Sequence, residues 1–322
     1  LRGYNPDIPA AFLTFVYFYY AYKNRQLSFK DIKNLTIVSL FAVLIKLSTI
    51  PLLIYSVILI LLKLQKREHT KPYIYLLGLI IVTMGYYSVK NIILTGYLVF
   101  PIAFTKLPVL WAVPQQEVAQ LSGVISSWAK IRSVNPEFFS LLNMRWIPTW
   151  FSKQTMQSLV TVFGGIFSIL GIGLLAATNK NKQLLTIFIG ILGMFIYWFL
   201  MAPDVRFGIG IFFVSLFICT SELLKHNHKK VTYVFGTLFL ILLVRSVPPI
   251  TNYYHWFRMI PKTRPAGLQP FPTKAIEVNG YTYYIPEEVG TDQANYANFP
   301  SAPYIDLCLQ QKKSGPFTIH YK

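Results

Sequence analysis

The charged side chains that stand within or beside long apolar stretches are the first candidates for chemistry in this sequence. Lys46 lies inside the apolar stretch 34–49, five residues before Pro51. An ionisable side chain inside an apolar span is costly to bury and marks a candidate substrate or ion site. The alternative is a lysine that extends its amine to a membrane interface from a short helix. Both readings stay open, and we predict Lys46 as a candidate phosphate ligand.

A second pair of charges, Asp204 and Arg206, lies in a short turn between two apolar stretches. The planar guanidinium group of arginine can hold a phosphate at two points. The alternative is a local ion pair that contributes little if it is exposed, with Asp204 favouring the start of the next helix through the helix dipole. We predict that Arg206 binds a lipid phosphate and that Asp204 orients it.

Other polar and aromatic side chains are candidates whose types also suit ordinary structural roles. Asp7 precedes the first apolar stretch, so it is either a helix-start residue or an acidic catalytic group. Basic and aromatic residues of the segment 90–156 would contact lipid headgroups or line a cavity at the interface; they are Trp111, Trp128, Lys130, Arg132 and Arg145. Of these, Arg145 is also a predicted phosphate ligand.

The sequence has no motif for a metal or a cofactor. It contains no pair of His or Cys residues at metal-ligand spacing, no HExxH and no Gly-rich phosphate loop. Cys219 lies in an apolar stretch and Cys308 in the polar tail, so no disulfide is predicted. We therefore predict no identified cofactor and leave a divalent metal open.

Long apolar stretches provide the elements that must position these groups. Only 13% of the residues are charged, against about 25% in soluble domains, and the mean hydropathy is +0.46. The stretches approach the length of about 20 residues that crosses a bilayer. The sequence therefore predicts an all-α transmembrane fold of about eight helices. They cover 8–22, 34–49, 50–64, 73–89, 157–177, 183–201, 207–223 and 231–248.

The basic residues divide among alternate loops, which orients the chain. Lysines and arginines follow the first, third, fifth and seventh stretches, and eight helices would bring these four loops to one side. The positive-inside rule makes that side cytoplasmic. This explains much of the net charge of +18 better than nucleic-acid binding does. We predict a multi-pass protein of the bacterial inner membrane with a non-cytoplasmic C-terminus and no nucleic-acid partner.

Two domains follow from this pattern: a transmembrane domain, 1–248, and a non-cytoplasmic tail or cap, 249–322. The outer loop 90–156 should contain amphipathic helices at 115–130 and 136–147 that lie flat in the interface. In the first, Val118, Leu121, Ile125 and Trp128 form an apolar stripe. The tail should be a small mixed cap, with extended runs such as 281–285. Pro51 should open the returning helix of a tight hairpin.

Several of these motifs resemble those of GT-C glycosyltransferases. The order of Asn5-Pro6-Asp7 with an apolar helix, a basic loop, a helix with Lys46-Leu-Ser-Thr and a return helix looks like the middle of such enzymes. Three stretches resemble an uncharacterised family of bacterial GT-C-like membrane proteins more closely. They are 93–101 with 111–114, 198–207 with Ala-Pro-Asp-Val-Arg, and 295–304. The matches together span most of the chain.

The resemblance implies a glycosyltransferase that takes a sugar from a polyprenyl-phosphate carrier on the outer face of the inner membrane. Its partners would be membrane lipids, that donor, and a glycan, lipid or protein acceptor. An acidic residue would activate the acceptor hydroxyl while basic residues stabilise the departing phosphate. Such enzymes usually carry the catalytic acid in the first outer loop, and we expect this chain to lack the N-terminal part that holds it. Asp7 is the acidic candidate present, and a cysteine pair of the related tails is replaced by Tyr and Ser.

Two other functions stay open. The chain could be a non-catalytic scaffold subunit of an envelope complex that binds through its outer loop and tail. It could also be a transporter, which would place ionisable partners near the bilayer midplane and show internal repeats. The transporter ranks last, because the sequence shows no repeat and no partner for Lys46 within its own helices.

Overall fold

The computed structural model describes residues 6–24, 27–66, 70–133, 143–225, 237, 273–278, 281–286, 310–314 and 317–321. The chain divides into two compact units. One contains 6–89 and 120–247, which we call the helical unit. The other contains 1–5, 90–119 and 248–322, which we call the second unit.

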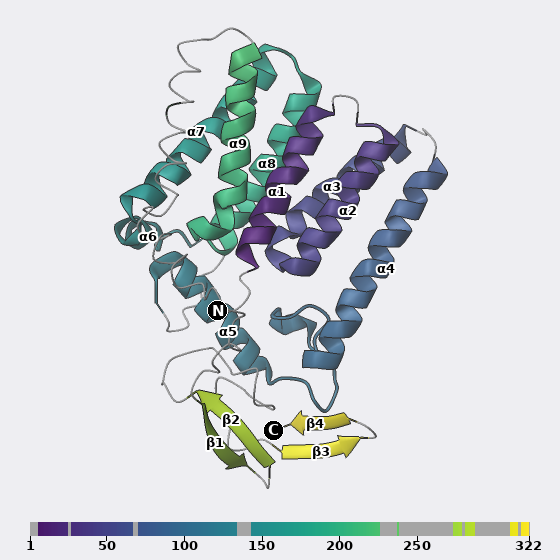
Figure 1. Cartoon of the computed structure of the whole chain (residues 1–322), viewed down its shortest axis with the longest axis vertical. Coiled ribbons are helices and arrows are strands. Elements are labelled where there is room, and N and C mark those ends of the chain that lie inside the picture. The colour runs from purple at the N-terminus through teal and green to yellow at the C-terminus, as the bar shows by residue number, and fades with distance from the viewer. Residues whose placement is uncertain are drawn as a thin grey trace, which may run out of the picture. The chain divides into compact units, whose positions relative to one another are not determined.

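Seven of the predicted apolar stretches are helices (Figure 1). These are α1 (Asp7–Lys23), α2 (Phe29–Ile45), α3 (Ile50–Gln65), α4 (Thr70–Thr95), α7 (Met156–Thr178), α8 (Lys182–Met201) and α9 (Val205–Lys225). The eighth stretch, 231–248, lies outside the described residues apart from position 237. Within the described part, five segments are long and apolar enough to cross a membrane: Leu47–Gln65, α4, α7, α8 and α9. The prediction of an all-α, multi-pass membrane protein is confirmed at this level.

Local sequence signals set the helix boundaries. Ser28 and Asp31 form a capping box at the start of α2, in which the Ser28 hydroxyl accepts from the Asp31 amide and the Asp31 carboxylate accepts from the Ser28 amide. Asn181 caps α8 by accepting from the Leu184 amide. Pro51 lies in the first turn of α3, after a short 3₁₀ turn (Leu47–Thr49), so the predicted hairpin of α2 and α3 is present.

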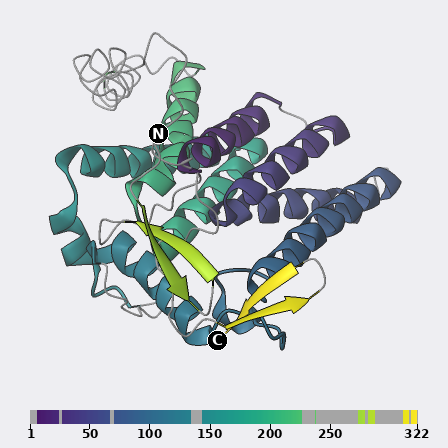
Figure 2. The same cartoon turned by 60° about the horizontal axis from the view of Figure 1, so that its bottom comes forward.

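The helical unit packs six of these helices side by side: α1, α2, α3, α7, α8 and α9 (Figures 1 and 2). A buried polar chain joins three of them. The Tyr17 hydroxyl of α1 is 2.7 Å from the Ser56 hydroxyl of α3, which donates to Ser39 of α2 at 3.2 Å. Such hydroxyl pairs satisfy polar groups inside an apolar bundle and hold its helices together.

Glycines set the closest helix contacts. A Cβ atom at Gly210 of α9 would collide with the backbone of Ala11 in α1, and one at Gly165 of α7 would collide with the Phe212 ring of α9. The lack of a side chain at Gly165 therefore lets α7 and α9 pack closely.

Helix α4 is largely exposed. Tyr73, Leu76 and Ile80 join the core of the helical unit, whereas large side chains such as Ile81 and Val82 are 72% and 70% exposed. So much uncovered apolar surface on one helix is unusual in a soluble monomer. It suits contact with lipid acyl chains.

The segment that follows α4 belongs to the second unit and folds back on itself. Gly96 has a φ of +77°, and a Cβ atom there would collide with the Ala112 backbone. The Trp111 indole donates to the Ile92 carbonyl at 2.9 Å, and the Tyr97 hydroxyl donates to the Val113 carbonyl at 2.8 Å. This turn requires glycine because other residues rarely adopt a positive φ and no side chain fits.

Of the predicted interfacial helices, the first is present as α5 (Gln115–Ile131). Leu121, Ile125 and Trp128 are 39%, 43% and 41% exposed, while Val118 is buried. The second prediction, 136–147, falls mostly outside the described residues. Its described end contradicts it, because 143–146 are not helical and α6 (Ile147–Lys153) begins only at Ile147, with Pro148 in its first turn.

The described tail consists of two separate hairpins. Strands β1 (Thr273–Val278) and β2 (Tyr281–Pro286) pair antiparallel, with Thr273 opposite Pro286. Strands β3 (Gln310–Ser314) and β4 (Phe317–Tyr321) pair in the same way. The predicted extended run 281–285 is therefore strand β2.

Candidate functional site

The turn between α8 and α9 is the centre of the candidate site. The Trp198 indole of α8 donates to the Asp204 carbonyl at 2.7 Å, and the Trp150 indole of α6 donates to the Pro203 carbonyl at 2.7 Å. The Asp204 amide also donates to the Ala202 carbonyl at 2.8 Å. These bonds satisfy the backbone groups of the turn and fix the direction of the Asp204 side chain.

The Asp204 carboxylate is the buried hub of an arginine pair. Its side chain is 1% exposed. The Arg206 guanidinium donates through Nε to Oδ1 at 3.2 Å and through Nη2 to Oδ2 at 3.0 Å. Arg132, which follows α5 with a φ of +57°, donates through Nη1 to Oδ2 at 2.8 Å. We call Asp204, Arg132 and Arg206 the arginine clamp.

The charge state of the clamp follows from these contacts. Burial by itself would raise the pKa of the Asp204 carboxyl. The hydrogen bonds from Arg206 and the charges of Arg206 and Arg132 outweigh burial and hold the pKa below its usual value. Asp204 is therefore an anion at neutral pH and a hydrogen-bond acceptor, not a proton donor.

A second ion pair lies beside the clamp in the helical unit. The Lys46 amine, at the end of α2, donates to the Asp7 carboxylate at the start of α1. It also lies 3.4 Å from the centre of the Phe207 ring, and the Arg206 guanidinium lies 5.6 Å from the same ring. Phe207 thus contacts two cations at once, an arrangement that cation–π attraction favours.

The two ion pairs together form a surface that can receive an anion. Three cations and two carboxylates, Asp7 and Asp204, leave a net charge of +1. The side chains of Arg206 and Arg132 are 56% and 29% exposed. Arg206 directs two of its N–H groups at Asp204, and a guanidinium carries five. The remaining N–H groups can donate to a phosphate while Asp204 fixes the orientation of the Arg206 guanidinium.

The structure brings together four of the residues predicted to bind phosphate, orient its ligand or act as base: Asp7, Lys46, Asp204 and Arg206. Lys46 pairs with Asp7 of α1, so its partner lies outside its own helices, to which the argument against a transporter referred. Arg145 has an exposed side chain, and its backbone amide donates to the Asn143 side chain at 3.1 Å. Trp111 belongs to the second unit.

Sequence reasoning missed the main role of Arg132, which was assigned only to headgroup contact. The Arg132 guanidinium also lies 5.8 Å from the centre of the Trp128 ring. Lys130, two residues earlier, is buried with its amine 5.5 Å from the centre of the Trp146 ring. Burial lowers the pKa of Lys130. Two basic residues at the end of an amphipathic helix were the only signal, and they do not identify Asp204 as a partner.

The candidate site resembles no metal centre. Within the described residues, no group of three or more His, Cys, Asp or Glu side chains is placed to hold a metal ion. The chemistry that this end of the helical unit can perform with its own residues is anion binding by its partly exposed arginines.

Comparison with known proteins identifies a family and no function. No curated protein and no solved structure matches the chain significantly. A family profile, described as a domain of unknown function (DUF8201), matches residues 5–213. The matched part contains both ion pairs of the candidate site and covers more than half of the sequence, so this chain belongs to the DUF8201 family of domains of unknown function.

Proposed function

We propose that this protein is a membrane glycosyltransferase that binds a polyprenyl-phosphate sugar through the arginine clamp and transfers the sugar to a cell-surface acceptor. The observation that carries the proposal is the buried Asp204 carboxylate, which holds two partly exposed guanidinium groups beside a third cation, Lys46. A lipid-linked phosphate cannot leave the membrane surface, so its ligands must lie at the ends of membrane-spanning helices. The clamp lies where α8 ends and α9 begins.

Each residue would have a distinct role. Arg206 would contact the phosphate with the donors that Asp204 leaves, and Arg132 would add a second guanidinium. Lys46, held by Asp7 and the Phe207 ring, would balance the charge that develops as the phosphate departs. Asp7 is the candidate base for the acceptor hydroxyl, with Arg145 as a further phosphate ligand.

The proposal includes a topology. Eight crossings would place the clamp, the segment 90–156 and the tail outside the bacterial inner membrane. The helix ends that carry Lys23, Lys66, Lys180 and Lys225 would then be cytoplasmic. The exposed stripe of Leu121, Ile125 and Trp128 would let α5 rest on the lipid surface.

The proposal is tested with the full chain reconstituted in liposomes. Binding of polyprenyl phosphate and transfer of radiolabelled sugar from a polyprenyl-phosphate donor are measured for the wild type, Arg206→Lys and Asp7→Asn. Arg206→Lys keeps the positive charge but loses the planar guanidinium, which can donate to a phosphate at two points. It should weaken binding by about ten- to a hundredfold, since a charge-assisted hydrogen bond contributes about 1.5–3 kcal/mol.

Lys153→Gln is the matched control, because Lys153 is an exposed cation at the end of α6 with no role in the clamp. It should bind polyprenyl phosphate as the wild type does. Equal binding by the wild type and Arg206→Lys would contradict the proposed phosphate contact.

A non-catalytic scaffold is the second candidate, and one observation favours it. Both carboxylates of the site are already engaged by cations, as they would be in a purely structural network. Asp7→Asn separates the two functions. An enzyme that uses Asp7 as base loses transfer and keeps polyprenyl-phosphate binding, whereas a scaffold has no transfer activity to lose.

A further inference from the structure

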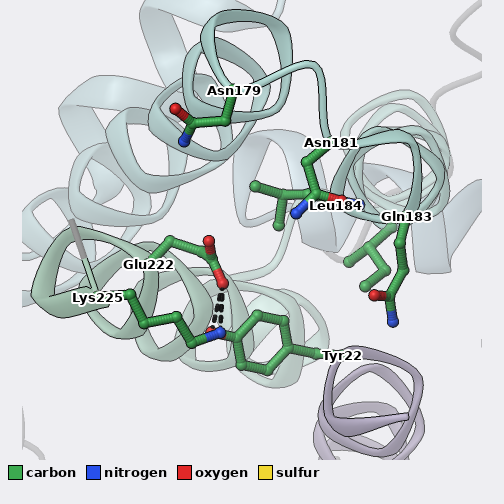
Figure 3. Close-up of a pocket in the computed structure, with 8 residues that line it drawn as sticks. Tyr22, Asn179, Asn181, Gln183, Leu184, Glu222 and Lys225 are labelled. Carbon is green, nitrogen blue, oxygen red and sulfur yellow. Dashed lines mark hydrogen bonds and ion pairs between the residues drawn. The ribbon is translucent and has the colours of Figure 1, made fainter. Parts of the chain in front are cut away.

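A pocket lies at the end of the helical unit opposite to the clamp, between the ends of α1, α7, α8 and α9. Its volume is about 630 Å³, within the range of about 300–1,000 Å³ that is usual for ligand sites. Its lining, drawn in Figure 3, is mostly polar and includes two apolar side chains, Leu184 and Ile187. The polar lining residues are Tyr22, Asn179, Asn181, Gln183, Glu222 and Lys225.

One wall of the pocket is a hydrogen-bonded cluster that links α1 to α9 (Figure 3). The Tyr22 hydroxyl donates to Glu222 Oε1 at 2.7 Å. The Lys225 amine donates to the same oxygen and to the Tyr22 hydroxyl, each at 2.6 Å. Glu222 is 5% exposed, so its charge is largely screened from the pocket by these two partners. An ammonium group has three donors, so Lys225 keeps one for a ligand.

The opposite wall offers amide groups at the start of α8. The Asn181 side-chain oxygen accepts from the Leu184 amide, which leaves the Asn181 amide nitrogen as a donor. The Gln183 nitrogen donates to the carbonyls of Ala21 and Asn24 at 2.9 and 3.0 Å, which leaves its oxygen as an acceptor. The start of the 20-residue helix α8 adds a positive dipole end.

Three lysines are direct sequence neighbours of lining residues. Lys23 follows Tyr22, and Lys180 and Lys182 flank Asn181; all three side chains are exposed. The Glu222–Lys225 pair of the lining is neutral as a whole, so these three neighbouring lysines make this end of the helical unit basic. Basic pockets between the ends of membrane-spanning helices are typical binding sites for phospholipid headgroups.

We propose that this pocket binds the phosphate ester of an anionic ligand, with the headgroup of an anionic glycerophospholipid as its source in the membrane. The phosphate lies against Lys225 and the start of α8, where the charge of Lys182, between the lining residues Asn181 and Gln183, adds to the attraction, and the glycerol hydroxyls lie against the amides of Asn181 and Gln183. The first carbons of the lipid lie over Leu184 and Ile187. This site is independent of the clamp and of the proposed transfer reaction.

The test uses the full chain in micelles of a neutral detergent. Binding of dihexanoyl phosphatidylglycerol is compared with binding of dihexanoyl phosphatidylcholine, which has the same acyl chains and no net charge. Binding of glycerol phosphate, a soluble phosphate ester without acyl chains, is measured in the same way. We expect the protein to bind phosphatidylglycerol more tightly than phosphatidylcholine. Tighter binding of phosphatidylglycerol than of glycerol phosphate identifies the lipid as the source, and equal binding identifies a soluble phosphate ester.

Two substitutions test whether phosphatidylglycerol binds in this pocket. Lys225→Met and Lys182→Gln should each weaken phosphatidylglycerol binding about fivefold, the effect of one lysine at a lipid surface. Lys182→Gln removes a cation from a helix start, where a cation is unfavourable, so this variant keeps its fold even if Lys225→Met does not.

Lys66→Gln is the matched control, because Lys66 is an exposed lysine at the end of α3 and, unlike Lys182, has no sequence neighbour that lines the pocket. It should leave the affinity unchanged. Equal affinity for both lipids, or a loss with Lys66→Gln as large as with Lys182→Gln, would overturn the proposal.

Discussion

Replacing Asp204 by asparagine should destabilise the helical unit more than the same kind of change at a more exposed carboxylate, because Asp204 is buried. The carboxylate accepts three side-chain hydrogen bonds, one from Arg132 and two from Arg206, and a fourth from the Arg206 amide. Breaking a buried ion pair by removing one partner costs about 3–5 kcal/mol. Because Arg206 is 56% exposed and can turn to water, we expect about 3 kcal/mol, the lower end of that range.

The assay is thermal unfolding of the purified chain in detergent. For a unit of this size, about 3 kcal/mol corresponds to a loss of roughly 6–12 °C in Tm. Asp31→Asn is the control. Asp31 also accepts three hydrogen bonds from side-chain and backbone groups, but it lies in the capping box of α2 and has no arginine partner. Loss of a cap costs about 1 kcal/mol.

The pH dependence of Tm tests independently whether the Asp204 carboxylate stabilises the fold in its charged form. The pKa of Asp204 is lowered in the folded protein, so its contribution is fully present above the ordinary carboxyl pKa of about 3.9. The contribution is lost as the pH falls through the lowered pKa. The difference in Tm between the wild type and Asp204→Asn should therefore stay constant from pH 8 to about pH 5 and shrink in stronger acid. A Tm difference no larger than that of Asp31→Asn at neutral pH would refute the role of Asp204 as a hub.

Three further predictions follow from other contacts. Gly210→Val should prevent α1 from packing against α9, because even a Cβ atom collides with the Ala11 backbone, and loss of the folded chain in size-exclusion chromatography would show it. Asp7→Asn and Lys46→Met should be non-additive in a double-mutant cycle of Tm values by about 0.5 kcal/mol or more, as expected for contacting partners; strict additivity would argue against the ion pair. Cysteines at Trp128 and Lys66 should differ in labelling by an impermeant reagent in intact spheroplasts, with only position 128 modified, and labelling at 66 alone would invert the topology.

Patterns within one helix predicted much of the fold. Apolar runs of bilayer length identified seven of the described helices, and Pro51 identified the hairpin turn, because these signals depend on residues close in sequence. The pair of Asp204 and Arg206 was found for the same reason, since only one residue separates them.

Contacts between distant elements could not be found in this way. Arg132 meets Asp204 across 72 residues, and Lys46 meets Asp7 across 39. Helical periodicity states which residues share a face but not which neighbour that face meets. The packing partner depends on how side chains of several helices fit together, as at Gly210 and Ala11, and one sequence does not encode that fit in any short pattern.

The contact between Gly210 and the Ala11 backbone has a mechanical consequence. Helices α1 and α9 meet so closely at this point that no side chain fits between them. The same two helices carry Asp7 and Arg206 at one end, and Tyr22 and Glu222 at the other. The close contact therefore links the candidate site at one end of the two helices to the pocket at the other. A tilt of α1 away from α9 that widened one end would strain or break the hydrogen bonds at the other.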